Sequence, residues 1–173
     1  MWETLFFMTI FDEPAIVLKK ELMSLPIYGW YARIMEMIVV DREDGPGAIK
    51  ELARQAERAL GEGRPIIIFP EGTRQPPGAT PDYKPGIALL YRQLNIPCVP
   101  AALNSGLLWQ AHGLMRSPGL VTVEFLPPIA PGLDRKTFMS TLEERIESAT
   151  HRLEAEAHSD TKVPKNRLNA VNA

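Results

Sequence analysis

Cysteine is almost absent from this 173-residue chain, which contains only Cys98. A single thiol excludes an internal disulfide and any metal site built from several cysteines. Histidine is also scarce, and the three present, His112, His151 and His158, do not share a metal-ligand spacing. No apolar run approaches the ~18 residues that a membrane-spanning helix needs. The sequence therefore predicts no disulfide framework, no metal cluster and no spanning segment.

Neither sign of charge dominates, since 19 Lys and Arg residues stand against 21 Asp and Glu, for a net charge of −2. This balance argues against a nucleic-acid partner, because binding driven by phosphate attraction needs clustered positive charge. Hydrophobic residues make up 45% and charged residues 23% of the chain, which is typical of globular proteins. The length is sufficient for one domain with a sizeable core.

The most informative stretch is Ile-Ile-Ile-Phe-Pro-Glu-Gly-Thr-Arg, residues 66–74. Its first four residues form a short apolar run, which indicates a strand buried on both faces. Pro70 cannot donate to a sheet ladder and so ends the strand. A carboxylate, a glycine, a hydroxyl and a guanidinium follow immediately, from Glu71, Gly72, Thr73 and Arg74.

This order of residues is typical of α/β proteins, in which a strand carries polar groups to the crevice at its carboxyl end. Gly72 lets backbone N–H groups approach an anion closely, and Arg74 offers a planar fork that matches phosphate oxygens. The alternative is a surface turn in which Glu71 and Arg74 form a solvated ion pair. Spacing alone leaves both interpretations open.

Apolar runs alternate with amphipathic stripes along the chain. Besides residues 66–69, the pattern predicts strands over residues 15–18, 34–40, 96–103 and 121–126. It predicts helices over residues 27–33, 48–60 and 87–94, and a final helix that Asp134 caps. The apolar first eleven residues predict a helix that packs on the core or lies on lipid. We expect one α/β domain, residues 1–157, with a largely parallel central sheet flanked by helices, and a polar tail, residues 158–173.

The string Phe-Pro-Glu-Gly-Thr-Arg resembles the central motif of the glycerolipid acyltransferases, the lysophosphatidate acyltransferase-like enzymes. These enzymes move a fatty acyl group from a thioester to a lysophospholipid hydroxyl. Further stretches are similar to other motifs of the family: residues 19–22 with Pro26 and Gly29, residues 39–42, and Val99 with Pro100. The resemblance extends from Trp2 to about Leu153 and implies the α/β fold of that family.

The resemblance also implies the substrates: acyl transfer to the sn-2 hydroxyl of lysophosphatidic acid or a related lysophospholipid. It implies no cofactor, with acyl-CoA or acyl carrier protein as the acyl donor. The acceptor phosphate would be held by a cradle of residues, namely Arg74, Thr73, Gly72, Arg42 and Lys20. Glu71 would orient Arg74 or accept from a glycerol hydroxyl, while Val99 and Pro100 would position the donor. The expected location is peripheral, at the cytoplasmic face of the membrane.

In the family, the base is a histidine that precedes an orienting acid by a few residues. Glu3 stands where that acid is expected, and the histidine would fall upstream of Met1. We therefore expect a chain truncated at its N-terminus, soluble by itself and impaired in catalysis. His151 and Glu156 have a similar spacing, but five residues apart on a helix means about 140° apart around its axis.

Other functions compete with this interpretation. A non-catalytic domain of the same fold that binds phospholipid or phosphate would keep Arg74 and need no base. A hydrolase is less well supported, because Asn104-Ser105-Gly106 lacks the G-x-S-x-G elbow. Nucleotide binding is weaker still, since neither glycine-rich phosphate-binding motif occurs.

Overall fold

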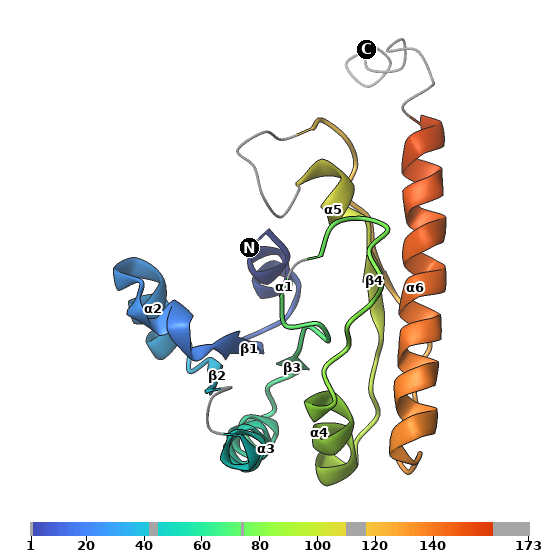
Figure 1. The fold of residues 1–173 in the computed structure, drawn as a ribbon. Helices are drawn as coiled ribbons and strands as arrows, with labels where there is room; N and C mark the ends of the chain where they lie inside the picture. Colours follow the sequence, from blue (N-terminus) through green and yellow to red (C-terminus); the bar gives the residue numbers. More distant parts are fainter. Residues whose placement is uncertain (1, 42–44, 74, 110–116, 161–173) are drawn as a thin grey trace.

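The computed structural model describes residues 2–41, 45–73, 75–109 and 117–160 (Figure 1). The first half contains α1 (Trp2–Ile10), β1 (Ala15–Lys19), the 3-10 helix η1 (Lys20–Ser24), α2 (Pro26–Ile34), β2 (Ile38–Val40), α3 (Pro46–Gly61) and β3 (Ile66–Ile67). The second half contains α4 (Gly86–Leu94), β4 (Ala101–Leu103), α5 (Ser105–Leu108), β5 (Val123–Phe125) and α6 (Arg135–Asp160).

Strand β1 is the centre of a three-stranded parallel sheet with the order β2-β1-β3. Lys19 is level with Val40 of β2, and Ile16 is level with Ile67 of β3. Strands β4 and β5 form a separate antiparallel pair. The predicted α/β fold with a parallel sheet is therefore confirmed, and the last two strands pair with each other rather than with that sheet.

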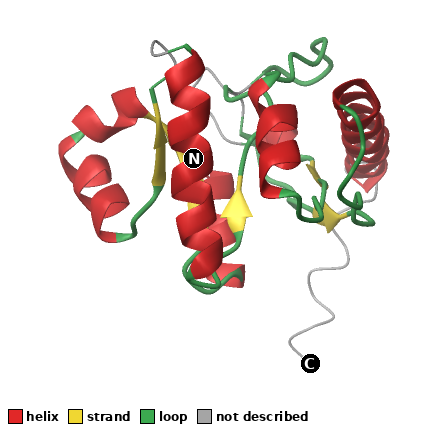
Figure 2. Ribbon diagram, turned by 90° about the horizontal axis from the view of Figure 1, so that it is seen from below, coloured by secondary structure: helices red, strands yellow, loops and turns green. Residues whose placement is uncertain are grey.

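Helices cover both faces of the parallel sheet because side chains of β1 alternate between them. Ile16 and Leu18 pack with α1 and α2, whereas Ala15 packs with residues of α3 and α4. Figure 2 shows α3 and α4 in front of the strands, and Figure 1 shows α1 on the opposite side. Among the described helices, none has both the length and the apolar character needed to cross a bilayer.

The strand expected over residues 66–69 is shorter than the sequence indicated. Only Ile66 and Ile67 are strand residues, and both are half-buried. Because β3 is an edge strand, it has one hydrogen-bonded neighbour and is not enclosed on its other side. Its two faces are nonetheless covered, since Ile66 packs towards the α3 and α4 side and Ile67 towards the α1 and α2 side.

The other differences lie at element boundaries. The strand expected over residues 34–40 begins at Ile38, because α2 continues to Ile34 and a turn with a left-handed Glu36 follows. Asp134 caps α6 as predicted, and its carboxylate accepts the backbone N–H groups of Lys136 and Thr137 at 2.9 and 3.1 Å. Helix α6 continues past residue 157 to Asp160, and residues 161–173 lie outside the described part of the chain.

A close approach of η1 to α2 fixes how α2 sits on the molecule. Gly29 and Ala32 of α2 are buried, and Tyr31 donates a hydrogen bond to Met8 of α1 at 3.2 Å. A Cβ added at Gly29 would lie 2.8 Å from the carbonyl carbon of Met23 and closer still to its oxygen. Only glycine at position 29 leaves room for the Met23 carbonyl, so the side of α2 that carries Gly29 and Ala32 faces inwards.

We predict that Gly29→Ala destabilises the fold by about 1–3 kcal/mol, the range for an overpacked site. Gly61→Ala is the matched control, because a Cβ there meets nothing within 4 Å. That substitution should be neutral or stabilise the helix by up to ~1 kcal/mol. Urea unfolding of both variants measures the difference, and equal stabilities would contradict the tight packing of α2.

Candidate functional site

The parallel register brings the ends of three strands to one edge of the sheet. Lys19 ends β1, Val40 ends β2 opposite it, and β3 is followed by the Phe-Pro-Glu-Gly-Thr motif. The carboxyl edge of a parallel sheet is where α/β proteins bind ligands. Arg42 and Arg74 lie outside the described residues, so the structure describes their neighbours Asp41 and Thr73 but not the two arginines themselves.

A tight turn follows β3. The N–H of Gly72 donates to the carbonyl oxygen of Phe69 at 3.0 Å, with Pro70 at the second position of the turn. Gly72 has a φ of 61°, in the left-handed region that favours glycine. The turn uses the Gly72 amide, while Thr73 next to it is exposed. Thr73 is thus presented to solvent by a turn whose shape depends on Pro70 and Gly72.

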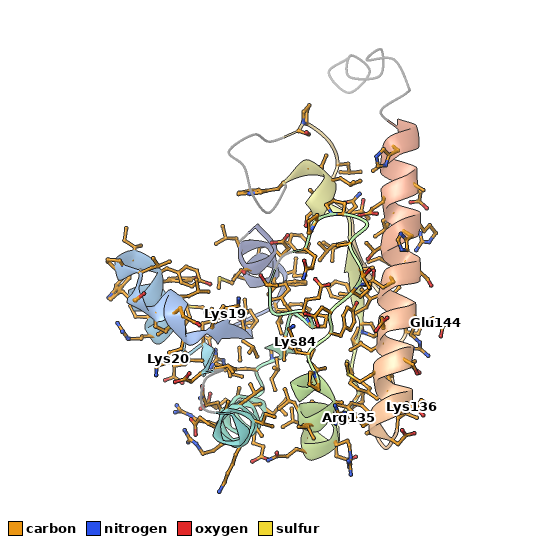
Figure 3. All side chains as sticks on the ribbon, in the orientation of Figure 1. Lys19, Lys20, Lys84, Arg135, Lys136 and Glu144 are labelled. Atoms are coloured by element: carbon orange, nitrogen blue, oxygen red, sulfur yellow. The ribbon has the colours of Figure 1, made fainter. Side chains whose placement is uncertain are left out.

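Two consecutive lysines at the end of β1 have different environments, and Figure 3 labels both. The Lys20 side chain is 65% exposed and pairs with Asp41 across 2.6 Å. Lys19 is half-buried, and its side chain forms no hydrogen bond or ion pair with another residue in the described ranges. Its strand position puts it on the face of Ala15 and Val17, on the side of α3 and α4.

This difference bears on which lysine can meet an anion. An ammonium without a charged partner can interact fully with an incoming anion, whereas one already paired with a carboxylate gains less. The sequence-based choice was Lys20, whose charge already has a carboxylate beside it. The signal that could have pointed to Lys19 is the two-residue alternation of β1, which places every second side chain on one face.

Glu71 faces the segment that returns towards the motif. Its carboxylate accepts the backbone N–H of Asp82 at 3.4 Å, and the N–H of Lys84 donates to the carbonyl of Pro70 at 2.9 Å. Burial raises the pKa of Glu71, and the nearby charges of Glu147 and Asp82 add to the rise. Glu71 therefore lies among other acids. The expectation that Glu71 orients Arg74 stays a prediction, because Arg74 lies outside the described residues.

The same returning segment joins the motif to α6. The hydroxyl of Tyr83 donates to Glu147 of α6 at 2.8 Å. Burial, followed by this hydrogen bond, raises the pKa of Tyr83 well above its usual range, so the phenol stays protonated. This bond fixes the loop after the motif against the long helix.

Glu3 makes a long-range hydrogen bond that sequence analysis did not anticipate. The hydroxyl of Ser105, which is 2% exposed, donates to the Glu3 carboxylate at 2.6 Å. Burial by itself would raise the pKa of Glu3, but hydrogen bonds, led by that from Ser105, lower it overall. The carboxylate is therefore held ionised in a half-buried position. No local pattern indicates a contact between residues this far apart in the chain.

Neighbouring residues hold Ser105 in place. Ser105 begins α5 directly after β4, where buried Asn104 accepts the N–H of Thr122 at 2.8 Å through its side-chain oxygen. A Cβ at Gly106 would lie 3.5 Å from the ring of Pro77, in the loop that follows the motif. The start of α1, the motif loop and the start of α5 therefore lie together.

Val99 and Pro100 precede β4. Pro100 is fully buried and its carbonyl accepts the N–H of Leu126 at 2.8 Å, whereas Val99 is 52% exposed. Pro100 therefore anchors the backbone, and the Val99 side chain beside it lies on the surface. Among the described residues, no group of three or more His, Cys, Asp or Glu side chains is placed to hold a metal ion. His151 and His158 are exposed on α6, and His112 lies outside the described chain.

A family model described as acyltransferase matches residues 1–104, which include α1, the parallel sheet and the motif loop. The chain belongs to the acyltransferase family. Its curated relatives include a 1-acyl-sn-glycerol-3-phosphate acyltransferase of Pseudomonas aeruginosa, 33% identical over 85% of this chain and 57% of the relative. A protein of the same description from Helicobacter pylori is 29% identical over 76% of this chain and 56% of the relative.

A solved structure shares the fold of this chain. It is the 1-acyl-sn-glycerophosphate acyltransferase PlsC of Thermotoga maritima, with a TM-score of 0.66 and 23% identity. The match covers 83% of this chain and 58% of that one. The chain thus spans somewhat more than half the length of these relatives.

We predict that Ser105→Ala destabilises the fold by about 1–3 kcal/mol at neutral pH, because it removes a hydrogen bond from a half-buried carboxylate. The folded-state pKa of Glu3 is lowered, so its contribution is present above the unfolded pKa and is lost as the pH falls through the folded one. The cost of Ser105→Ala should therefore shrink below about pH 4.

Urea unfolding at several pH values and carboxyl NMR titration of Glu3 measure both effects. The NMR titration should show a higher pKa of Glu3 in the variant. Ser140→Ala, at an exposed position of α6, is the control and should stay within about 0.5 kcal/mol of the parent at every pH. A cost of Ser105→Ala that does not depend on pH would contradict the assigned hydrogen bond.

Proposed function

We propose that the chain is the catalytic α/β body of an enzyme that transfers a fatty acyl group from a thioester to the sn-2 hydroxyl of lysophosphatidate or a related lysophospholipid. The observation that supports this proposal is the parallel register, because β1 ends at Lys19 and the neighbouring strand β3 is followed by the Phe69–Gly72 turn. Family membership and the names of the relatives support the same reaction.

The acceptor phosphate is the handle by which the lysophospholipid would be held. Charge-assisted hydrogen bonds from lysine and arginine are the strong ones, and an arginine fork binds phosphate bidentately. In this proposal Arg74, Arg42 and Thr73 contact the phosphate together with a lysine. That lysine is Lys19, whereas the sequence favours Lys20 for this role. Binding a non-reacting group in this way positions the reacting hydroxyl and lowers the entropic part of the barrier.

The reaction itself needs a base near the acceptor hydroxyl. As the base takes the proton, the hydroxyl oxygen forms a bond to the thioester carbonyl carbon. The carbon–sulfur bond then breaks, and the base returns the proton to the leaving thiolate. Glu3, held ionised by Ser105, is the proposed acid that orients this base. We assign the base to none of the described histidines, because His151 and His158 are exposed on α6.

The remaining parts of the proposal concern the donor and the location. The donor is a fatty acyl thioester of coenzyme A or of acyl carrier protein, with Val99 and Pro100 beside its acyl chain, and no further cofactor takes part. The natural acceptor resides in a lipid bilayer, so the protein works as a peripheral protein at the cytoplasmic face of the membrane.

We predict that Arg74→Ala and Lys19→Ala each weaken binding of a short-chain lysophosphatidate by ~1.5–3 kcal/mol, roughly ten- to a hundredfold, the range for hydrogen bonds to charged groups. Arg74→Lys should recover only part of the loss, because an ammonium lacks the planar fork. Isothermal titration calorimetry of the variants measures this, at a lipid concentration below that of micelle formation.

Lys20→Ala is the matched control and should change binding less than about threefold, since an exposed, already paired lysine contributes little. A neutral monoacylglycerol of the same chain length should bind the parent and all variants alike. Equal losses for the phosphate-bearing and the neutral lipid would contradict the proposed phosphate site. A larger loss from Lys20→Ala than from Lys19→Ala would return the role to Lys20.

A further inference from the structure

Helix α2 carries a row of large apolar side chains on its outer surface. Ile27 is 84% exposed, Trp30 61% and Ile34 58%. Trp30 and Ile34 follow Ile27 by three and seven residues. On a helix these three side chains therefore lie within an arc of about 60° around the axis and form one stripe. Leu25, the extended residue directly before the helix, is 51% exposed and adds an apolar side chain near its first turn.

The packing of α2 forces this stripe outwards. Gly29 and Ala32 form the buried side, and the Met23 carbonyl leaves no room for a side chain at Gly29. Rotating the helix to bury Trp30 would therefore bring a bulky residue against the backbone of η1. In Figure 1, α2 lies at the margin of the molecule, on the opposite side from α6.

A positive charge borders the stripe. Arg33 is exposed and lies about 60° around the helix from Trp30. Among the residues in the described ranges, none forms a hydrogen bond or ion pair with the guanidinium of Arg33. An apolar stripe that contains a tryptophan and is flanked by a free cation matches the boundary between lipid head groups and acyl chains.

The stripe is also continuous with the candidate phosphate site. Strand β1 ends at Lys19, η1 spans Lys20–Ser24, and α2 follows after Leu25 alone. The five-residue 3-10 helix η1 thus connects the lysine at the sheet edge to the apolar stripe. A protein that takes its acceptor from a bilayer needs a lipid-facing surface beside its site, and this is the nearest exposed apolar face along the chain.

The size of the stripe favours lipid over a second copy of the chain. Three exposed side chains on a nine-residue helix, with Leu25 directly before it, offer an apolar area on the order of 400 Å². A stable dimer buries about 800 Å² on each partner. Insertion into a bilayer has no such minimum area.

We propose that the outer face of α2, formed by Leu25, Ile27, Trp30 and Ile34 with Arg33 at its border, docks onto the surface of an anionic lipid bilayer. This inference rests on the proposed function for its choice of lipid as the occupant. Docking places the end of β1 at the head-group level, where the phosphate of a lysophospholipid lies.

Vesicle binding tests the proposal with the whole chain. Flotation with vesicles of phosphatidylcholine and phosphatidylglycerol should recover the parent, and Ile27→Asp/Ile34→Asp should reduce its partition at least about tenfold. Leu120→Asp is the matched control, because Leu120 is 76% exposed at the surface far from α2 in sequence. Arg33→Gln should weaken binding to the anionic vesicles about fivefold and leave pure phosphatidylcholine unaffected.

Insertion depth gives an independent measurement. Brominated lipids should quench part of the tryptophan fluorescence, and Trp30→Phe should remove that part. Unchanged vesicle binding by Ile27→Asp/Ile34→Asp, or an equal loss in Leu120→Asp, would overturn the proposal. A concentration-dependent dimer in light scattering that the double variant abolishes would assign the face to a second copy instead.

One comparison separates this inference from the proposed function. The double variant should still bind monomeric short-chain lysophosphatidate as the parent does. If the parent binds vesicles through α2 but has no affinity for lysophosphatidate, the proposed function is contradicted and the docking face is supported. If the parent binds lysophosphatidate but not vesicles, the docking face is contradicted and the proposed phosphate site is supported.

Discussion

The parallel pairing of β1 with β2 and β3 is the constraint on which the rest of the structure depends. It makes the three strands end at one edge, so residues from three separate stretches of the chain become neighbours. It also divides the side chains of β1 between two layers of helices, so Lys19 lies on the side of α3 and α4, whereas Lys20 lies beyond the strand in η1. A register slip of one residue would move every side chain of β1, Lys19 included, to the opposite layer.

Two contacts join the second half of the chain to this sheet edge. The hydrogen bond from Ser105 to Glu3 attaches the start of α5 to the start of α1, and that from Tyr83 to Glu147 attaches the motif loop to α6. Both involve partly buried acids. Since an unpaired buried carboxylate is costly, each bond fixes the position of its loop, and the bond from Ser105 also favours the ionised form of Glu3. The proposed acid of the catalytic pair is thus held by an element that the antiparallel strands support.

Much of this architecture could be predicted from the sequence, because the apolar patterns of the helices and the parallel strands are local. The Asp134 cap and the helices around α3 and α4 follow from short-range signals of this kind. Three features could not be predicted, since they depend on tertiary packing. The antiparallel pairing of β4 with β5, the Ser105 contact of Glu3 and the outward stripe of α2 arise from elements that meet only in the folded chain. The roles of Arg42 and Arg74 stay predictions, because both lie outside the described residues.

The most direct test of the account is to map where a lysophosphatidate binds. Amide chemical shifts in a ¹H–¹⁵N NMR titration with a short-chain lysophosphatidate should change most at Lys19, Gly72 and Thr73. Arg135 and Lys136 at the start of α6 are exposed basic residues away from the sheet edge and serve as an internal reference (Figure 3). Changes confined to Lys19 and the motif turn would support a phosphate site there. Changes centred on Arg135 and Lys136, with none at the sheet edge, would contradict it.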